Sequence, residues 1–352
     1  MGRAFTGQGV AGSLAGLPEN LIGTPRAVAS AGEPGAGDVL SDVLRSIRLT
    51  GSLQFCFMPS GDWETGGKAE LGKLAGGGGA VMPFHVVVEG SCWMRMEGRE
   101  IVLGEGDVVA FPFCTGHQLG VGSGGPTIMP IGDLPPKPWR TLPVLRYGDG
   151  PVSVRLLCGY LQCESLSFRP LQSALPTLIH VRTRSSNEAQ WLRATIGRMV
   201  AEADEPRPGG LSILERLTEL VFIELLRHQI IIAADQAATG WLAALADPAL
   251  GRCLALIHED STRDWSVEAL ASAAGMSRSV LAERFETVLG TSPIRYIREW
   301  RLCLASIALG TTERPIAQIA EEAGYGSEAA FNRAFSRHYG IPPAAWRAQN
   351  RR

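Results

Sequence analysis

One pattern occurs twice in the last third of the chain and constrains its fold more than any other feature. A glycine is followed by a serine, and a phenylalanine stands eight residues after that serine: Ser277 with Phe285, then Ser327 with Phe335. Glycine readily ends a helix, and a serine hydroxyl caps the start of the next. The repeat predicts two helix-turn-helix units. Their helices are expected at Ser266–Ala274, Ser277–Leu289, Ile316–Ala323 and Ser327–Tyr339.

A long amphipathic helix is predicted between the two units, at Pro293–Leu309. Its apolar residues recur at helical spacing and suit a helix shared by both units: Ile294, Ile297, Trp300, Leu304 and Ile307. A rigid spacer would allow two recognition helices to enter successive major grooves, roughly 34 Å apart on one face of double-stranded DNA. The pattern therefore favours sequence-specific binding to promoter or operator DNA.

The segment Asp247–Arg347 resembles the AraC/XylS-type DNA-binding domain of bacterial transcriptional regulators. The resemblance rests on two stretches, WSVEALASAAGMSRSVLAERFETVLGTSPIRYIREWRL and IAQIAEEAGYGSEAAFNRAFSRHYGIPPAAWR. It implies a regulator whose residues 247–352 bind DNA, with RNA polymerase as a further partner if the protein activates transcription.

The resemblance assigns DNA contacts by position. The candidates are Arg278, Ser279, Ala282, Glu283, Glu328, Ala329, Asn332, Arg333 and Arg337. Arg278 and Arg337 are expected at phosphates, and the others at base edges. The apolar residues expected in the core of the same helices are Leu281, Phe285, Phe331 and Phe335.

Several of these assignments have alternatives. Arg333 can contact either a base or a phosphate, and Asn332 can pair with adenine or stay solvated. Glu283 can accept a hydrogen bond from cytosine, or it can pair with Arg278 or Arg284 on its own helix.

From Val39 to about Val181 the sequence is β-like. Short apolar runs are separated by Gly, Pro and Asp turn signals, at Leu53–Met58, Phe84–Val88, Val108–Phe113 and Val152–Leu157. Many short strands at this spacing predict a small barrel or jelly roll. The glycine-rich residues 1–37 are expected to form a flexible tail.

Two stretches of this half are similar to the two cupin motifs. His85 and Glu89 lie in FHVVVEG, and His117 follows Pro112 in GDVVAFPFCTGH. The resemblance implies a cupin-like barrel at 38–185. His85, Glu89 and His117 could hold a divalent metal there, although Pro83 replaces one histidine of the motif. The alternative is that the barrel keeps only the cupin scaffold.

Together with RLLCGYLQCES and LQSALPTLIHV, the β-like half resembles the cupin-type sensor domain of one AraC subgroup. The resemblance implies that a small effector binds in the barrel and changes how the protein engages DNA. His85, His117 and Trp93 are the candidate effector-binding residues.

A helical linker is expected at 186–246, with helices at Asn187–Ala203 and Leu211–Ala234. The second carries an apolar stripe at Leu214, Leu217, Val221 and Leu225. That stripe can pack on the barrel or form a homodimer seam.

Composition narrows the class of protein. The net charge of −2 neither supports nor excludes DNA as a partner, and no apolar run reaches the roughly 20 residues that span a membrane. Seven scattered cysteines do not suggest a disulfide framework, so a cytoplasmic protein is expected. The fold class is α+β multidomain: a cupin-like barrel, a helical linker and a C-terminal all-α double helix-turn-helix.

Two alternatives to an effector-sensing regulator stay open. One is a metal-dependent cupin oxygenase or isomerase with an appended helical domain, although the lost ligand at Pro83 favours a protein that is not an enzyme. The other is a regulator whose input is thiol oxidation, with Cys158 and Cys163 as the obvious pair.

Overall fold

The computed structural model describes residues 38–46, 49–66, 80–163, 168–184, 189–235 and 239–350. The tail predicted at 1–37 lies outside these ranges. The described residues belong to one unit, Gly35–Arg352. None of their helices is long and apolar enough to cross a membrane.

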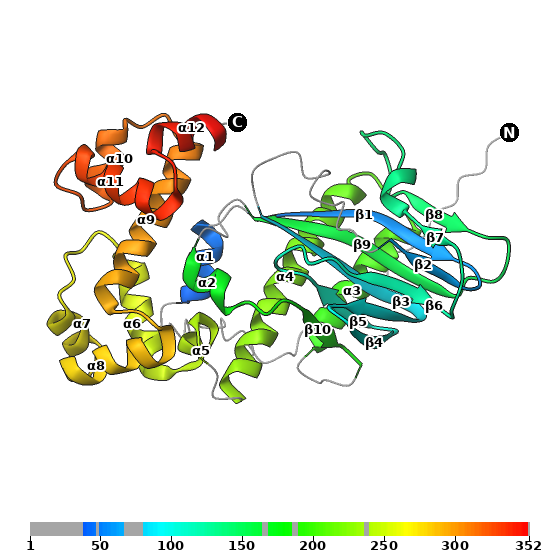
Figure 1. Ribbon diagram of the computed structural model, residues 1–352, viewed down its shortest axis with the longest axis horizontal. Helices are drawn as coiled ribbons and strands as arrows, with labels where there is room; N and C mark the ends of the chain where they lie inside the picture. Colours follow the sequence, from blue (N-terminus) through cyan, green and yellow to red (C-terminus); the bar gives the residue numbers. More distant parts are fainter. Residues whose placement is uncertain are drawn as a thin grey trace, which may run out of the picture. The chain divides into compact units, whose positions relative to one another are not determined.

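The N-terminal half is a β-barrel, as the sequence predicts (Figure 1). Its strands are β1 Leu49–Pro59, β2 Trp63–Thr65, β3 Ala80–Met96, β4 Arg99–Gly104, β5 Asp107–Ala110, β6 Gln118–Val121, β7 Thr127–Ile128, β8 Val144–Tyr147, β9 Val154–Cys163 and β10 Ile179–Arg182. The hydrogen-bonded order is β7-β2-β6-β3-β9-β1-β8, with β4 and β5 also paired to β3 and β10 paired to β5.

The long strand β3 joins the two parts of the barrel, because it pairs with β9 and β5 at one end and with β4 and β6 at the other. Its side chains alternate between two hydrophobic clusters. Val87 and Cys92 belong to the cluster inside the barrel, whereas Phe84 and Val86 belong to the cluster that continues into the helices. The alternation decides which side chains of β3 face the interior.

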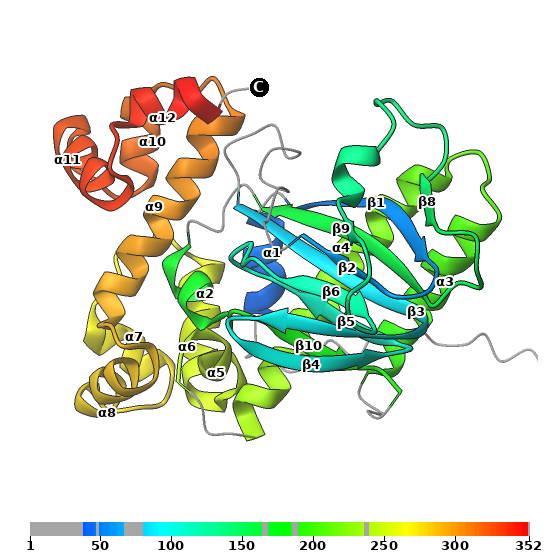
Figure 2. The same ribbon diagram turned by 45° about the vertical axis from the view of Figure 1, so that its right-hand side comes forward.

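Two helices cover the outer face of the barrel: α3 Gln190–Asp204 and α4 Gly210–Asp235. They pack on each other, and α4 packs on β1 (Figure 2). The approach is close at Gly51, where an added Cβ would lie 2.7 Å from the Thr218 side chain. Three residues of the predicted stripe on α4 are buried within the chain and Leu217 is partly buried, so the stripe packs within the chain.

The C-terminal half is helical throughout. Its elements are α5 Trp241–Ala246, α6 Pro248–Glu259, α7 Val267–Ala273, α8 Arg278–Arg284, a π-helical turn Phe285–Leu289, α9 Pro293–Thr311, α10 Ile316–Glu322, α11 Glu328–Tyr339 and α12 Pro343–Asn350. The predicted spacer is confirmed as α9, two residues longer than expected. The first predicted recognition helix changes at Phe285 from an α-helix to the π-helical turn.

Four short helices depart from the expected elements. The sequence from Val39 was expected to be β-like, but Val39–Ser46 forms helix α1, with Val39 and Val43 buried one turn apart. Arg169–Ala174 forms α2. Helices α5 and α12 were not predicted. The sequence WLAALA of α5 is apolar almost all round, and a segment without a polar face has no periodicity to detect.

Candidate DNA interface and barrel cavity

Each helix-turn-helix unit is built by the residues that the repeat singled out. The Ser277 hydroxyl accepts a hydrogen bond from the backbone N–H of Val280 at 3.3 Å, and Ser327 caps α11 in the same way. The turns before these caps contain Gly275 and Gly324, with φ of +71° and +78°. Glycine adopts this left-handed conformation without the steric cost that a Cβ imposes.

The predicted core residues and the predicted contact residues lie on opposite faces of α8 and α11. All four core residues are fully buried: Leu281, Phe285, Phe331 and Phe335. The predicted contact residues of the two helices are exposed, apart from the half-buried Asn332. The structure therefore places the nine candidates on two surfaces that a DNA groove could reach.

The two surfaces differ in charge. On the first unit, Arg278 pairs with Glu268 at 2.8 Å, and Arg284 pairs with Asp247 at 3.0 Å. Glu283 forms no ion pair with either of those arginines in the structure. On the second unit, Arg333 and Arg337 form no ion pair with a described acidic side chain. Uncompensated positive charge is thus concentrated on α11.

Arg333 and Arg337 line a hollow between α9 and the α10–α11 turn, together with Arg298 and Arg301 of α9. Arg301 is held in place, because its guanidinium donates to the carbonyl oxygens of Ser261 at 2.6 Å and Arg263 at 2.7 Å. Arg298 makes no ion pair with a described carboxylate. The sequence reasoning missed Arg298, since it lies on the spacer and not on a recognition helix.

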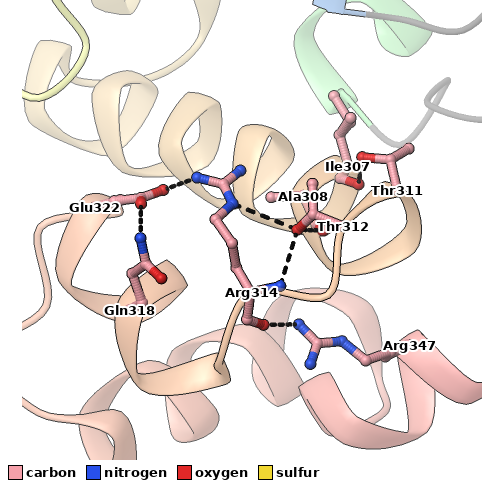
Figure 3. Close-up of polar contacts among 8 residues, drawn as sticks. All are labelled: Ile307, Ala308, Thr311, Thr312, Arg314, Gln318, Glu322 and Arg347. Atoms are coloured by element: carbon pink, nitrogen blue, oxygen red, sulfur yellow. Dashed lines mark hydrogen bonds and ion pairs between the residues drawn. The ribbon is translucent and has the colours of Figure 1, made fainter.

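A polar network fixes the turn that leads from the spacer into the second unit (Figure 3). Arg314 pairs with Glu322 of α10 at 2.5 Å, and its backbone carbonyl accepts a hydrogen bond from Arg347 of α12 at 2.6 Å. At the end of α9, the Thr312 hydroxyl donates a hydrogen bond to the carbonyl oxygen of Ala308, with 2.7 Å between the two oxygen atoms. These contacts tie α9, α10 and α12 together and so hold α11 in position.

In the barrel, the structure brings together the two histidines of the cupin-like motifs. The Nε2 atoms of His85 on β3 and His117 lie 2.8 Å apart. The Nδ1 atom of His85 lies 3.1 Å from Cys158 Sγ on β9, and the His117 ring stacks on Phe111 with centroids 3.7 Å apart. Burial lowers the pKa of both imidazoles, that of His85 strongly, so both are neutral near pH 7.

The hydrogen-bond geometry fixes one consistent arrangement of protons. His117 Nδ1 lies 3.0 Å from the carbonyl oxygen of Thr115, which can only accept, so Nδ1 carries the proton of the neutral ring. His117 Nε2 therefore accepts from His85 Nε2–H, and His85 Nδ1 accepts from the thiol of Cys158. Burial raises the pKa of Cys158 well above its ordinary value, which agrees with a protonated thiol. Every polar atom of the two imidazoles has a partner.

The structure contradicts the third predicted metal ligand, Glu89, which is not part of this cluster. Glu89 pairs with Arg155 at 3.3 Å, on the face of β3 that looks toward α3. The register of β3 against β9 shifts between Val87 and Glu89, so a β-bulge at Val88 reverses the alternation of side chains. His85 therefore points into the barrel and Glu89 points out of it. Among the described residues, no group of three or more His, Cys, Asp or Glu side chains could hold a metal ion.

Trp93, predicted to bind an effector, also lies outside the cavity. Its ring packs over Gly120, Nε1 donates to the carbonyl of Gly122 at 3.0 Å, and the Arg95 guanidinium lies 4.0 Å from the ring centroid. Cys92 and Met94, its neighbours on β3, are the ones that point inward. After the bulge at Val88 the side chains of β3 alternate regularly, so Trp93, which lies between Cys92 and Met94, faces outward.

The cavity itself is lined by His85, His117 and Cys158 together with apolar side chains of β1 and of the segment after β7. Two polar lining residues escaped the sequence reasoning: Thr65, and Gln54, which is fully buried. The register of β1 against β9 shifts between Leu53 and Phe55, so Gln54 is the extra residue of a bulge. Because of the bulge, Gln54 and its neighbour Phe55 both line the cavity, which strict alternation along the strand would not allow.

The thiol pair considered for redox sensing is not supported. Cys158 is buried and its pKa is raised, whereas a reactive thiol needs exposure and a lowered pKa. The side chain of Cys163 lies outside the described part of the chain.

The barrel and the paired recognition helices define a DNA-binding transcriptional regulator with a cupin-like domain. Comparisons with known proteins agree: residues 38–230 match the family described as Cupin, and residues 270–349 match the family described as Helix-turn-helix domain. An AraC-like transcription regulator of Streptomyces antibioticus is 31% identical over 320 residues, which cover 88% of this chain and 98% of that one. The chain belongs to the AraC-like family of transcription regulators.

Other relatives carry names of the same kind. An AraC-like transcription regulator of Streptomyces lividans is 30% identical over 321 residues, which cover 88% of this chain and 98% of that one. The HTH-type transcriptional regulator AlkR of Acinetobacter baylyi is 38% identical over 182 residues, covering 51% of this chain and 59% of its own.

Proposed function

We propose that the protein reads its operator with α8 and α11 from one face of the DNA, and that a small effector in the barrel cavity modulates this binding. The observation that carries the first part is the match between the two units. Each presents a capped helix whose apolar face is buried and whose predicted contact residues are exposed. Because α9 joins the units as one helix, two adjacent turns of DNA form the natural target.

The charge distribution supports unequal roles for the two units. Arg298, Arg333 and Arg337 line the hollow beside α11 together with Asp264, and none of the three arginines forms an ion pair with a described carboxylate, so they can neutralise phosphates and release counterions. On α8, the exposed Ser279, Ala282 and Glu283 offer small or acidic side chains. The second unit therefore supplies most of the electrostatic affinity, and the first unit contributes sequence preference.

Selection of binding sites from random DNA with the full-length protein, followed by hydroxyl-radical footprinting, tests this proposal. We expect an enriched site with two protected blocks about 10 base pairs apart on one face. A single block, or no enrichment over random DNA, would contradict it.

The cavity supports the second part, because a largely apolar pocket with a few convergent polar groups is the usual form of a small-molecule site. An effector must bind more tightly to one of two states of the protein in order to change its DNA affinity. A homodimer and a contact with RNA polymerase stay predictions of the sequence.

The experiment uses a small-molecule library scored by the operator affinity of the full-length protein. For any compound that changes this affinity, the double variant His85→Ala/His117→Ala is expected to lose the response and keep its nonspecific DNA binding. His180→Ala is the matched control, since His180 pairs with Asp107 on β5 and does not line the cavity. A normal response in the double variant would show that the two histidines are only structural.

The enzyme alternative has no comparable support. It required three ligands in the barrel, and Glu89 lies on the opposite face of β3 from His85. The relatives reported above are all named as transcription regulators.

A further inference from the structure

The described wall of the barrel cavity carries no charged side chain. Its described lining residues include no Asp, Glu, Lys or Arg, and burial keeps His85 and His117 neutral near pH 7. Burying an ion without a partner is costly, because the surrounding protein cannot replace its hydration. The cavity therefore disfavours a charged ligand of either sign.

One polar side-chain atom of a lining residue has no hydrogen-bond partner among the described residues. Gln54 Nε2 donates a hydrogen bond to Ser52 Oγ. With the amide in this orientation, Gln54 Oε1 is buried without a hydrogen bond to a described residue. An unpaired buried acceptor is unfavourable in the empty protein, and a ligand that donates to it relieves that cost.

The histidines offer no competing anchor, since their nitrogen atoms are already paired with each other, with Cys158 and with the carbonyl of Thr115. The rest of the wall includes aromatic and aliphatic side chains such as Phe55, Phe57 and Leu119. The empty space of about 740 Å³ includes open solvent at the mouth, so it is an upper limit on the volume of a ligand that the cavity holds.

We propose that this cavity binds a small, uncharged, mainly apolar molecule that donates one hydrogen bond to Gln54 Oε1. The inference rests on the proposed sensory role of the cavity and adds to it the chemical class of the ligand and the residue that orients it.

Three probes of nearly equal shape test the class: 2-naphthol, 2-methoxynaphthalene and 2-naphthoate. Their dissociation constants are measured on the full-length protein without DNA, near pH 7. We expect 2-naphthol to bind about tenfold more tightly than 2-methoxynaphthalene, because only the hydroxyl can donate to Oε1. The carboxylate of 2-naphthoate is expected to weaken binding by at least about tenfold relative to 2-naphthol.

A pair of variants tests the residue. Gln54→Leu removes the acceptor and is expected to abolish the advantage of 2-naphthol over 2-methoxynaphthalene. Gln162→Leu is the matched control, because Gln162 on β9 is also buried with an unpartnered amide nitrogen but does not line the cavity. The control is expected to keep the ranking of the three probes. Thermal unfolding of each variant shows whether it is folded.

Equal or tighter binding of 2-naphthoate, or no binding of any probe, would overturn the proposed ligand class. An unchanged advantage of 2-naphthol in folded Gln54→Leu would overturn the role of Gln54. If Gln54→Leu does not fold, the ranking of the probes on the unaltered protein still decides the class. The sensory role of the cavity is tested separately. It is contradicted if 2-naphthol binds as expected but every compound that occupies the cavity leaves operator affinity unchanged.

Discussion

Glu283 on α8 and Arg333 on α11 occupy the same position in the two helix-turn-helix units, six residues after the capping serine, and both are exposed. The repeat thus places an acidic side chain on one recognition surface where the other carries a guanidinium. The two units share a backbone plan and differ in the charge that they present to DNA.

Replacing Arg333 with alanine should weaken operator binding by about 1–3 kcal/mol if the side chain contacts a base, because a forked contact to guanine is lost. Binding titrations with the selected operator measure the effect. Arg216→Ala is a suitable control, since Arg216 is an exposed arginine on α4. Unchanged affinity in folded Arg333→Ala would remove this assignment.

Arg298 is expected to act at a phosphate. Arg298→Ala should weaken binding to all DNA sequences similarly and reduce the slope of log K against log salt by about 0.9. Arg278→Ala should change the slope less, because Glu268 already compensates Arg278. DNA-binding titrations at several salt concentrations measure the slope for each variant. Equal slopes for Arg298→Ala and Arg278→Ala would contradict the proposed asymmetry between the two units.

The histidine pair makes stability depend on pH. The folded protein holds the pKa of His85 and His117 below the ordinary value of about 6.5. As pH falls through that value, the unfolded chain binds protons that the folded barrel does not, so the free energy of unfolding decreases. Thermal unfolding at about pH 5 and about pH 7.5 should show this loss of stability, and a smaller loss in His85→Gln/His117→Gln.

Some dependence should persist in that variant, because burial also lowers the pKa of His258 in α6 to about 3. An equal loss in the variant and the unaltered protein would show that the pair does not contribute.

Two glycines provide a matched comparison of turn strain. Gly275→Ala should destabilise the protein by about 1–2 kcal/mol through its left-handed backbone alone, since an added Cβ meets no neighbour there. Gly324→Ala should cost more, because its Cβ would lie 2.5 Å from Nη1 of Arg301, whose hydrogen bonds to Ser261 and Arg263 resist displacement. Denaturant unfolding of both variants measures the difference, and equal losses would mean that Arg301 moves freely.

The position of Glu89 gives a fifth expectation. Glu89→Gln should leave ligand binding in the cavity unchanged, because the carboxylate lies on the other face of β3 and is largely exposed. Its effect on stability should stay within about 1 kcal/mol, as for other solvent-exposed ion pairs. Affinity for 2-naphthol measures the first point. A change of tenfold or more would place Glu89 in the ligand site after all.

The helical half was predictable because its signals are local. Caps, left-handed glycines and buried phenylalanines recur at fixed spacing around Ser277 and Ser327, and each acts on neighbouring backbone. Helix α5 escaped prediction because it is short and buried on nearly all sides, so its helical state depends on the neighbours that cover it. The boundary of α8 was missed where Phe285 begins the π-helical turn.

The barrel was predictable as an architecture but only partly as a site. The resemblance to the two cupin motifs placed His85 of β3 and His117, which directly precedes β6, in one barrel, and the structure brings their Nε2 atoms to 2.8 Å. Glu89 and Gln54 were misjudged or missed because each lies at a bulge, and an extra residue in one strand is visible only against its partner strand. Side-chain direction at such positions depends on long-range pairing and cannot be read from alternation alone.

The bulge at Val88 also has a consequence for descent within the family. A relative that lost this one residue would keep both the histidine and the carboxylate of the motif, yet its carboxylate would turn inward beside the imidazole. A relative that gained the residue would lose that ligand without any substitution. Insertions and deletions of single residues in β3 can therefore interconvert ligand sets that look identical in composition.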